Sequence, residues 1–124
     1  MSKILVIDDD KVVREAIVDI MELVDVSVLC ASNGPEGVEL FQGNQDAIAG
    51  VIVDRRMPMM DGFETIRELR NIQPNVPIIM SSGFADEESH PSQTASGSKP
   101  NAYLYKPYEI DDLIQLVDEI ILKR

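Results

Sequence analysis

The chain has 124 residues, 44% of them hydrophobic and 27% charged, which is the composition of an ordinary globular protein. This length predicts one domain over residues 1–124 with a core of its own. The formal net charge of −11 argues against direct nucleic-acid binding and against an anionic-membrane surface, because phosphate binding rests on clustered Lys and Arg.

Short apolar runs and the cysteine content exclude further classes. The N-terminal run of residues 4–7 is too short for a signal peptide, and no run approaches membrane-spanning length, so we expect a cytoplasmic protein. The single cysteine, Cys30, excludes an internal disulfide and a cysteine-rich metal site. Because Cys30 lies in an apolar run, we expect a buried structural thiol.

Apolar periodicity divides the chain into alternating strands and helices. Continuous apolar runs are typical of strands covered on both faces, and apolar residues at helical spacing indicate amphipathic helices. The predicted strands are residues 3–7, 26–31, 51–53, 77–81 and 102–105. The predicted helices are residues 11–23, a helix that opens at 32–35 and runs to 41, residues 62–72, and a closing helix marked by apolar residues from 110 to 121.

Residues 86–100 interrupt this pattern. They include Pro and Gly and offer almost no apolar face, so a helix here would be weak or disordered. Five strands alternating with helices nevertheless predict an α/β fold: a doubly wound five-stranded parallel sheet with right-handed crossovers, helices on both faces and a weak fourth helix.

Polar side chains that could bind a ligand or take part in a reaction lie at the ends of the predicted strands. They are Asp8 and Asp9 after the first strand, Asp54 after the third, Ser82 after the fourth and Lys106 after the fifth. An Asp after a strand is, by itself, more often a turn former than a functional residue. In a parallel sheet, however, all five residues reach one edge, and the first and third strands are neighbours at the switch point.

Three carboxylates at close range repel one another unless a cation neutralises them. Oxygen ligands without His or Cys favour Mg²⁺, and the lone histidine, His90, lies in the polar stretch and is not an expected ligand. With Mg²⁺ present, the Ser82 hydroxyl and the Lys106 ammonium complete a site for phosphoryl transfer to a carboxylate, which gives an acyl phosphate.

Four motifs carry a resemblance to a known family. They are residues 4–10 (ILVIDDD), 54–62 (DRRMPMMDG), 78–83 (IIMSSG) and 103–107 (YLYKP). The chain resembles, over essentially its whole length, the receiver domains of bacterial two-component response regulators. That resemblance implies a chemotaxis-regulator-like fold with the flavodoxin-like strand order 2-1-3-4-5.

The resemblance also implies a role for each matching residue. Asp54 is the implied phosphoacceptor, and Asp8, Asp9, Asp54 and the backbone carbonyl of Arg56 are the implied Mg²⁺ ligands. Ser82 is the implied switch hydroxyl, Lys106 the phosphate-binding ammonium, and Tyr103 the aromatic residue whose orientation follows phosphorylation. The bond between Lys106 and Pro107 is commonly cis in this family, as only X-Pro bonds allow at low cost.

The implied partners are a histidine kinase or histidine phosphotransfer protein as donor, and a downstream protein or an output domain outside these residues as reader. Because phosphorylation and dephosphorylation are self-catalysed, the domain is a signalling phosphoacceptor and not an enzyme. Residues 81–84 also resemble receivers attached to hybrid sensor kinases. Residues 86–100 are then either a tolerated surface loop or a segment that orders on phosphorylation or partner binding.

Two alternatives stay open at this point. A degenerate receiver would act as an unphosphorylated interaction module, which the intact set of five polar residues opposes. A phosphohydrolase with an aspartyl nucleophile generally needs a second acid close after the nucleophile, and Arg56 stands there instead.

Four neighbours of the predicted site receive hypotheses of their own. We expect Asp10 to cap the first helix and not to join Asp8 and Asp9 as a ligand of Mg²⁺. Arg55 is interpreted as a solvated surface charge. Arg56 and Phe84 are predicted to alter the phosphoryl lifetime by crowding the attacking water.

Overall fold

The computed structural model describes residues 2–83 and 99–123. Its strands are β1 (Lys3–Ile7), β2 (Ser27–Ala31), β3 (Ile48–Asp54), β4 (Ile78–Gly83) and β5 (Ala102–Lys106). Its helices are α1 (Lys11–Glu22), α2 (Gly34–Gly43), α3 (Gly62–Ile72) and α4 (Ile110–Leu116), with a 3-10 turn η1 (Gln45–Ala47) before β3 and a π-helical segment η3 (Val117–Leu122) after α4. The predicted weak helix at 86–100 falls almost entirely outside the described residues.

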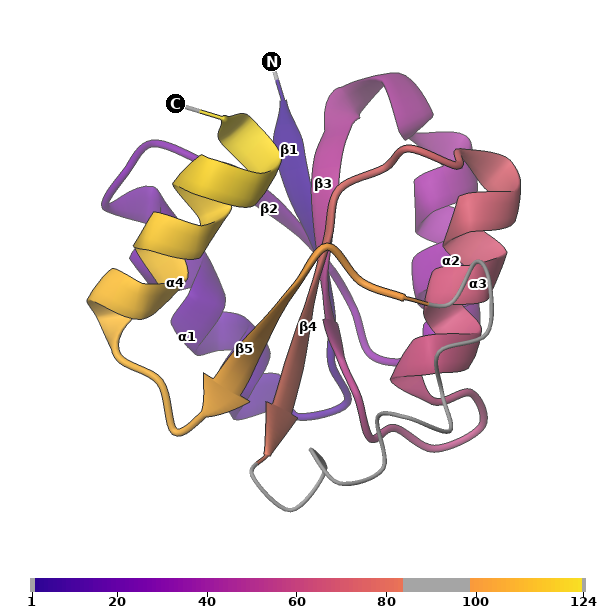
Figure 1. The fold of residues 1–124 in the computed structure, drawn as a ribbon, viewed down its shortest axis with the longest axis horizontal. Helices are drawn as coiled ribbons and strands as arrows, with labels where there is room; N and C mark the ends of the chain where they lie inside the picture. Colours follow the sequence, from indigo (N-terminus) through magenta and orange to yellow (C-terminus); the bar gives the residue numbers. More distant parts are fainter. Residues whose placement is uncertain (1, 84–98, 124) are drawn as a thin grey trace.

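The five strands form one parallel sheet in the order β2-β1-β3-β4-β5 (Figure 1). This confirms the predicted doubly wound fold and its strand order. Because all five strands run in the same direction, their carboxyl ends lie along one edge of the sheet. The order places β1 beside β3, so the end of the first strand and the end of the third strand are neighbours.

Helices cover both faces of the sheet (Figure 1). One core cluster lies under α2 and α3 and takes Leu5 and Val53 from the strands, together with Phe41 and Ile66 from the helices. The other lies under α1, α4 and η3 and takes alternate strand residues such as Ile52. Successive strand side chains point to opposite faces, so continuous apolar runs supply both clusters.

Short polar side chains fix where the helices begin. The Asp10 carboxylate accepts a hydrogen bond from the Val12 N–H at 2.9 Å, which confirms it as the cap of α1. Asp61 opens α3 through a capping box in which its carboxylate accepts from the Glu64 N–H at 2.9 Å. These caps set the directions in which α1 and α3 leave the carboxyl edge of the sheet.

The amino edge of β4 and β5 is held by Arg70 of α3. Its guanidinium donates hydrogen bonds to the backbone carbonyls of Pro74, Val76 and Lys99 and to the side-chain oxygen of Asn101, at 2.9–3.1 Å. The same Asn101 oxygen accepts from the Ile78 N–H at 2.8 Å. One cation therefore joins α3 to the starts of both strands.

Two expectations about the strands need correction. Cys30 was predicted to be buried, but it is exposed, because β2 is an edge strand with a neighbour on one side only. β3 begins at Ile48 and is longer than the predicted 51–53. Gly50 continues the strand where a side chain would collide with Ile121, whose Cγ2 lies 2.6 Å from the position of a Cβ.

Within the described residues, no helix combines the length and the apolar character needed to cross a membrane.

Candidate functional site at the carboxyl edge of the sheet

The site is built around an ion pair that crosses the sheet. Asp54 ends β3 and is 7% exposed. Lys106 ends β5, and its Nζ lies 2.8 Å from Asp54 Oδ1 although β4 separates the two strands. Lys106 pairs in register with Gly83 of β4, so the lysine side chain crosses β4 beside a residue that has no side chain of its own. The Asp54 carboxylate therefore lies next to the positive charge of Lys106.

Asp8 and Asp9 bring two more carboxylates to this ion pair. One carboxylate oxygen from each of Asp8, Asp9 and Asp54 lies within 4.8 Å of the other two. The backbone holds Asp8 in place, because its Oδ1 accepts a hydrogen bond from the Asp10 N–H at 2.8 Å. The Arg14 guanidinium donates to the Asp8 backbone carbonyl at 2.7 Å.

The electrostatics reflect burial and crowding of like charges. Burial raises the pKa of Asp8 to about 6, and the neighbouring Asp54 and Asp9 carboxylates act in the same direction. Burial also raises the pKa of Asp54, against the opposing hydrogen bond from Lys106. Burial lowers the pKa of Lys106, but its hydrogen bond to Asp54 and the attraction of the Asp54 and Asp8 carboxylates together raise it by more, so the net shift is upward. One ammonium therefore offsets only part of the negative charge.

This donor set suits a hard divalent cation. All three side-chain ligands are carboxylates, two of them are buried, and their oxygens are near enough to share one ion. Mg²⁺ prefers such oxygen ligands and retains several waters, and the third carboxylate, Asp9, is exposed. An added cation would also relieve the repulsion that raises the pKa of Asp8. The residues therefore fit Mg²⁺.

The remaining predicted residues lie around the ion pair. Ser82, the penultimate residue of β4, is buried, and its hydroxyl donates a long hydrogen bond of 3.4 Å to the Gly83 carbonyl. Tyr103 of β5 stacks on Tyr105 with ring centroids 5.8 Å apart, and it packs against the core cluster under α2 and α3. The bond between Lys106 and Pro107 is cis, as the resemblance implied.

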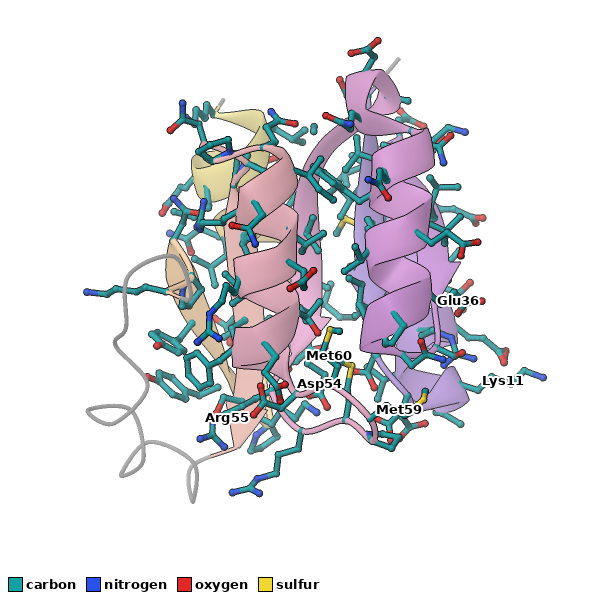
Figure 2. The ribbon with its side chains drawn as sticks, turned by 90° about the vertical axis from the view of Figure 1, so that its right-hand side faces the viewer. Lys11, Glu36, Asp54, Arg55, Met59 and Met60 are labelled. Carbon is teal, nitrogen blue, oxygen red and sulfur yellow. The ribbon has the colours of Figure 1, made fainter. Side chains whose placement is uncertain are left out.

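A tight loop follows Asp54 and returns the chain to α3. The Met60 N–H donates to the Pro58 carbonyl at 2.8 Å, which makes a γ-turn around Met59 with φ of 71°. The Gly62 N–H donates to the Arg55 carbonyl at 2.8 Å, and a Cβ on Gly62 would lie 2.7 Å from the Asp54 carbonyl oxygen. Figure 2 shows Asp54, Met59 and Met60 at the same end of the molecule. Glycine is required here because the loop passes directly over the end of β3.

Arg55 is not the solvated charge that its sequence context indicated. It is 8% exposed, and its guanidinium carbon lies 5.2 Å from the centre of the Phe63 ring. Arg55 follows Asp54 directly, so the alternation along the chain sends it to the face covered by α3 (Figure 2). Phe84, named with Arg56 in the hypothesis on phosphoryl lifetime, lies outside the described residues.

Sequence reasoning missed three residues that the fold brings to this site. Arg14 holds the Asp8 backbone, as described above. Tyr108 has its pKa raised by burial and interacts electrostatically with Lys106, Asp8 and Asp54. Ser81 pairs in register with Asp54. The only sequence signal was position: Arg14 lies one turn into α1, and Tyr108 and Ser81 lie within two residues of predicted site residues.

A family model for the response regulator receiver domain matches residues 4–118, and the chain belongs to this family. It is 32% identical to a response regulator receiver domain from Clostridium thermocellum, with a TM-score of 0.88 over 99% of this chain and 96% of that one. The receiver domain of the sensor histidine kinase PA1611 from Pseudomonas aeruginosa has the same fold, with a TM-score of 0.84 over 97% of both chains at 23% identity.

The curated relatives are longer proteins. The regulatory protein AtoC of Escherichia coli is 28% identical over 121 residues, which make up 98% of this chain and 25% of AtoC. The chain spans between a quarter and about half of the length of the curated relatives it matches.

Proposed function

We propose that this chain, as a single domain over residues 1–124, is the phosphoacceptor switch of a two-component phosphorelay. A phosphohistidine on a histidine kinase or phosphotransfer protein donates its phosphoryl group to Asp54. The observation that carries this proposal is the buried Asp54 carboxylate, hydrogen-bonded to Lys106 across β4 and grouped with Asp8 and Asp9. Membership of the receiver family supports the same assignment.

In the transfer step an Asp54 carboxylate oxygen attacks phosphorus, the bond from phosphorus to the donor imidazole nitrogen breaks, and that bond's electron pair stays on the nitrogen. Lys106 leaves the carboxylate, whose charge falls, and pairs with a phosphoryl oxygen. Ser82 donates its hydroxyl hydrogen bond to another phosphoryl oxygen, and the orientation of Tyr103 follows phosphorylation. The change in this surface is read by a downstream protein or an output domain.

Asp8, Asp9, Asp54 and the backbone carbonyl of Arg56 would hold Mg²⁺. When bound, the ion supplies positive charge that offsets the phosphoryl oxygens and the carboxylate cluster. The PA1611 receiver domain, which shares this fold, has a magnesium ion coordinated in its active site cleft. The chain's own residues bind and orient the phosphoryl group, so phosphorylation and dephosphorylation are self-catalysed and the domain is a cytoplasmic signalling module, not an enzyme that turns over a separate substrate.

The test is intact-mass spectrometry after incubation with acetyl phosphate and Mg²⁺. The wild-type chain is expected to gain one phosphoryl group that EDTA prevents. Asp54→Ala is expected to gain none, and Asp46→Ala, an exposed carboxylate in η1 before the start of β3, is the matched control that still gains one. An unmodified wild-type chain that binds Mg²⁺, and that a phosphorylated donor protein also fails to modify, would contradict the proposal and favour an unphosphorylated interaction module.

A further inference from the structure

A second serine of β4, Ser81, pairs in register with Asp54 and takes no part in the proposed transfer step. Ser81 is 3% exposed, and its Oγ has no hydrogen-bond partner among the described residues. Buried hydroxyls almost always have a partner, because leaving one without a hydrogen bond costs stability. Alanine would fill this position without that cost, so the hydroxyl calls for an explanation.

The register of the sheet shows what Ser81 faces. Ile52 of β3 pairs with Ile79 of β4, and both belong to the core cluster under α1 and α4. Two residues further along each strand, Asp54 pairs with Ser81, and the alternation of side chains places these two residues on that same face. Paired side chains on one face of a sheet lie about 5 Å apart at Cβ, which is near enough for a rotating hydroxyl to approach the carboxylate.

Lys106 closes this arrangement from the other side. Ser81 also pairs with Leu104 of β5, and Lys106 stands two residues beyond Leu104 on the same face. To reach Asp54, the lysine side chain crosses β4 at the level of Ser81 and Gly83. In the structure the Lys106 ammonium donates to Asp54 Oδ1, and the Ser81 hydroxyl is hydrogen-bonded to neither of these charged groups.

From this geometry we propose that Ser81 is a positioning residue of the phosphorylated site, and that it shortens the lifetime of the acyl phosphate. The inference rests on the proposed function. Once Lys106 moves to a phosphoryl oxygen, the Asp54 oxygen that does not carry phosphorus is a carbonyl acceptor. The Ser81 hydroxyl donates its hydrogen bond to this oxygen.

The direction of the effect follows from where charge develops. In hydrolysis a water oxygen bonds to phosphorus, the bond from phosphorus to the Asp54 oxygen breaks, and its electron pair returns to the carboxyl group. The proton lost by the water goes to solvent. Negative charge therefore grows on the carboxyl group, and a donor to that group is stronger in the transition state than in the acyl phosphate. The hydroxyl accelerates dephosphorylation.

The experiment compares decay of the phosphorylated chain in Ser81→Ala and wild type, after acetyl phosphate is removed and Mg²⁺ is kept. Loss of one charge-strengthened hydrogen bond is expected to slow decay about 3- to 10-fold and to raise the phosphorylated fraction at steady state. Ser81→Thr, which keeps a hydroxyl, is expected to decay faster than Ser81→Ala. Thr65→Val removes a buried hydroxyl whose partner is the Asp61 carbonyl and is expected to decay as wild type does.

A second measurement separates this role from a structural one. In urea without phosphoryl donor, Ser81→Ala is expected to unfold at the same or a higher denaturant concentration than wild type, since it removes a hydroxyl without a partner among the described residues. A lower midpoint, or decay at the wild-type rate, would overturn the inference while leaving Asp54 as the acceptor. A wild-type chain that takes up no phosphoryl group would overturn the proposed function itself.

Discussion

The two ends of the parallel sheet hold their cations in opposite ways. At the amino edge, Arg70 donates to three backbone carbonyls and to Asn101, all of which need a donor. At the carboxyl edge, Lys106 bonds to one carboxylate within a group of three, and the hydroxyl of Ser81, which pairs with Asp54, has no hydrogen-bond partner within residues 2–83 and 99–123. A satisfied polar network holds the fold together, whereas an incompletely satisfied one leaves capacity for a ligand.

The strongest test of this contrast is Arg70→Ala. Because it leaves the carbonyls at the start of β4 and β5 without their charged donor, we expect it to lower the free energy of unfolding by about 3 kcal/mol, measured by urea denaturation. Phosphoryl uptake by the folded variant should be unchanged. Arg67→Ala, an exposed arginine on the same helix, is the control and should change stability by less than about 0.5 kcal/mol. An equally small effect of Arg70→Ala would contradict the claim that the Arg70 hydrogen bonds stabilise the fold.

The next test uses the pH dependence of stability at the carboxyl edge. The pKa of Asp8 is about 6 in the folded chain against 3.8 for an ordinary aspartate. The folded chain therefore binds more protons than the unfolded chain between these values, and stability falls as pH rises through this window. Without divalent ions, the free energy of unfolding of wild type should fall by about 2 kcal/mol relative to that of Asp8→Asn as pH rises through this window. This figure includes an allowance for solvent screening.

Urea denaturation from pH 4 to pH 7.5 measures this difference, and comparison with Asp8→Asn cancels the contribution of the other acidic residues. Mg²⁺ should restore stability to wild type at pH 7 and have less effect on Asp8→Asn, since the ion binds the folded state through this carboxylate. If the free energy of unfolding had the same pH dependence in both chains, the ionised Asp8 carboxylate would not destabilise the fold, and the prediction would be wrong.

The smallest expected effect separates two neighbours at the same edge. Asp10 is satisfied as the cap of α1, so Asp10→Ala should lower the free energy of unfolding by about 1 kcal/mol at pH 7, while Asp10→Ser should restore most of it. Asp8→Asn should change stability in the opposite direction at that pH. The same urea series measures both, and a shared sign would mean that hydrogen bonding does not distinguish the two carboxylates.

The gathering of Asp8, Asp54 and Lys106 was predictable, because strand direction alone brings strand ends to one edge. The burial or exposure of other residues was not predictable in this way. Cys30 is exposed because β2 lies at the edge, and an apolar run does not reveal its place in the strand order. Arg55 is buried because its guanidinium packs over the ring of Phe63, which lies on the next helix. These outcomes depend on contacts between separate elements and not on local pattern.

The Arg70 network was invisible for a related reason. Two of its acceptors, Lys99 and Asn101, come 29 and 31 residues later in the chain, and neither residue type indicates such a contact. Ser81, whose hydroxyl has no partner in the described part of the chain, likewise precedes the motif residue Ser82, and only the register with Asp54 shows which face it shares. Local pattern predicted the fold and the charged groups, and tertiary pairing determined which polar groups are satisfied.

The central claim is that the incompletely satisfied edge accepts a phosphoryl group at Asp54, and locating that group tests it most directly. The chain would be phosphorylated with acetyl phosphate and Mg²⁺, reduced with borohydride to convert the acyl phosphate into a stable alcohol, digested and analysed by peptide mass spectrometry. We predict reduction at Asp54 and at no other carboxylate. Reduction at Asp8 or Asp9, or spread over several acidic residues, would contradict the account.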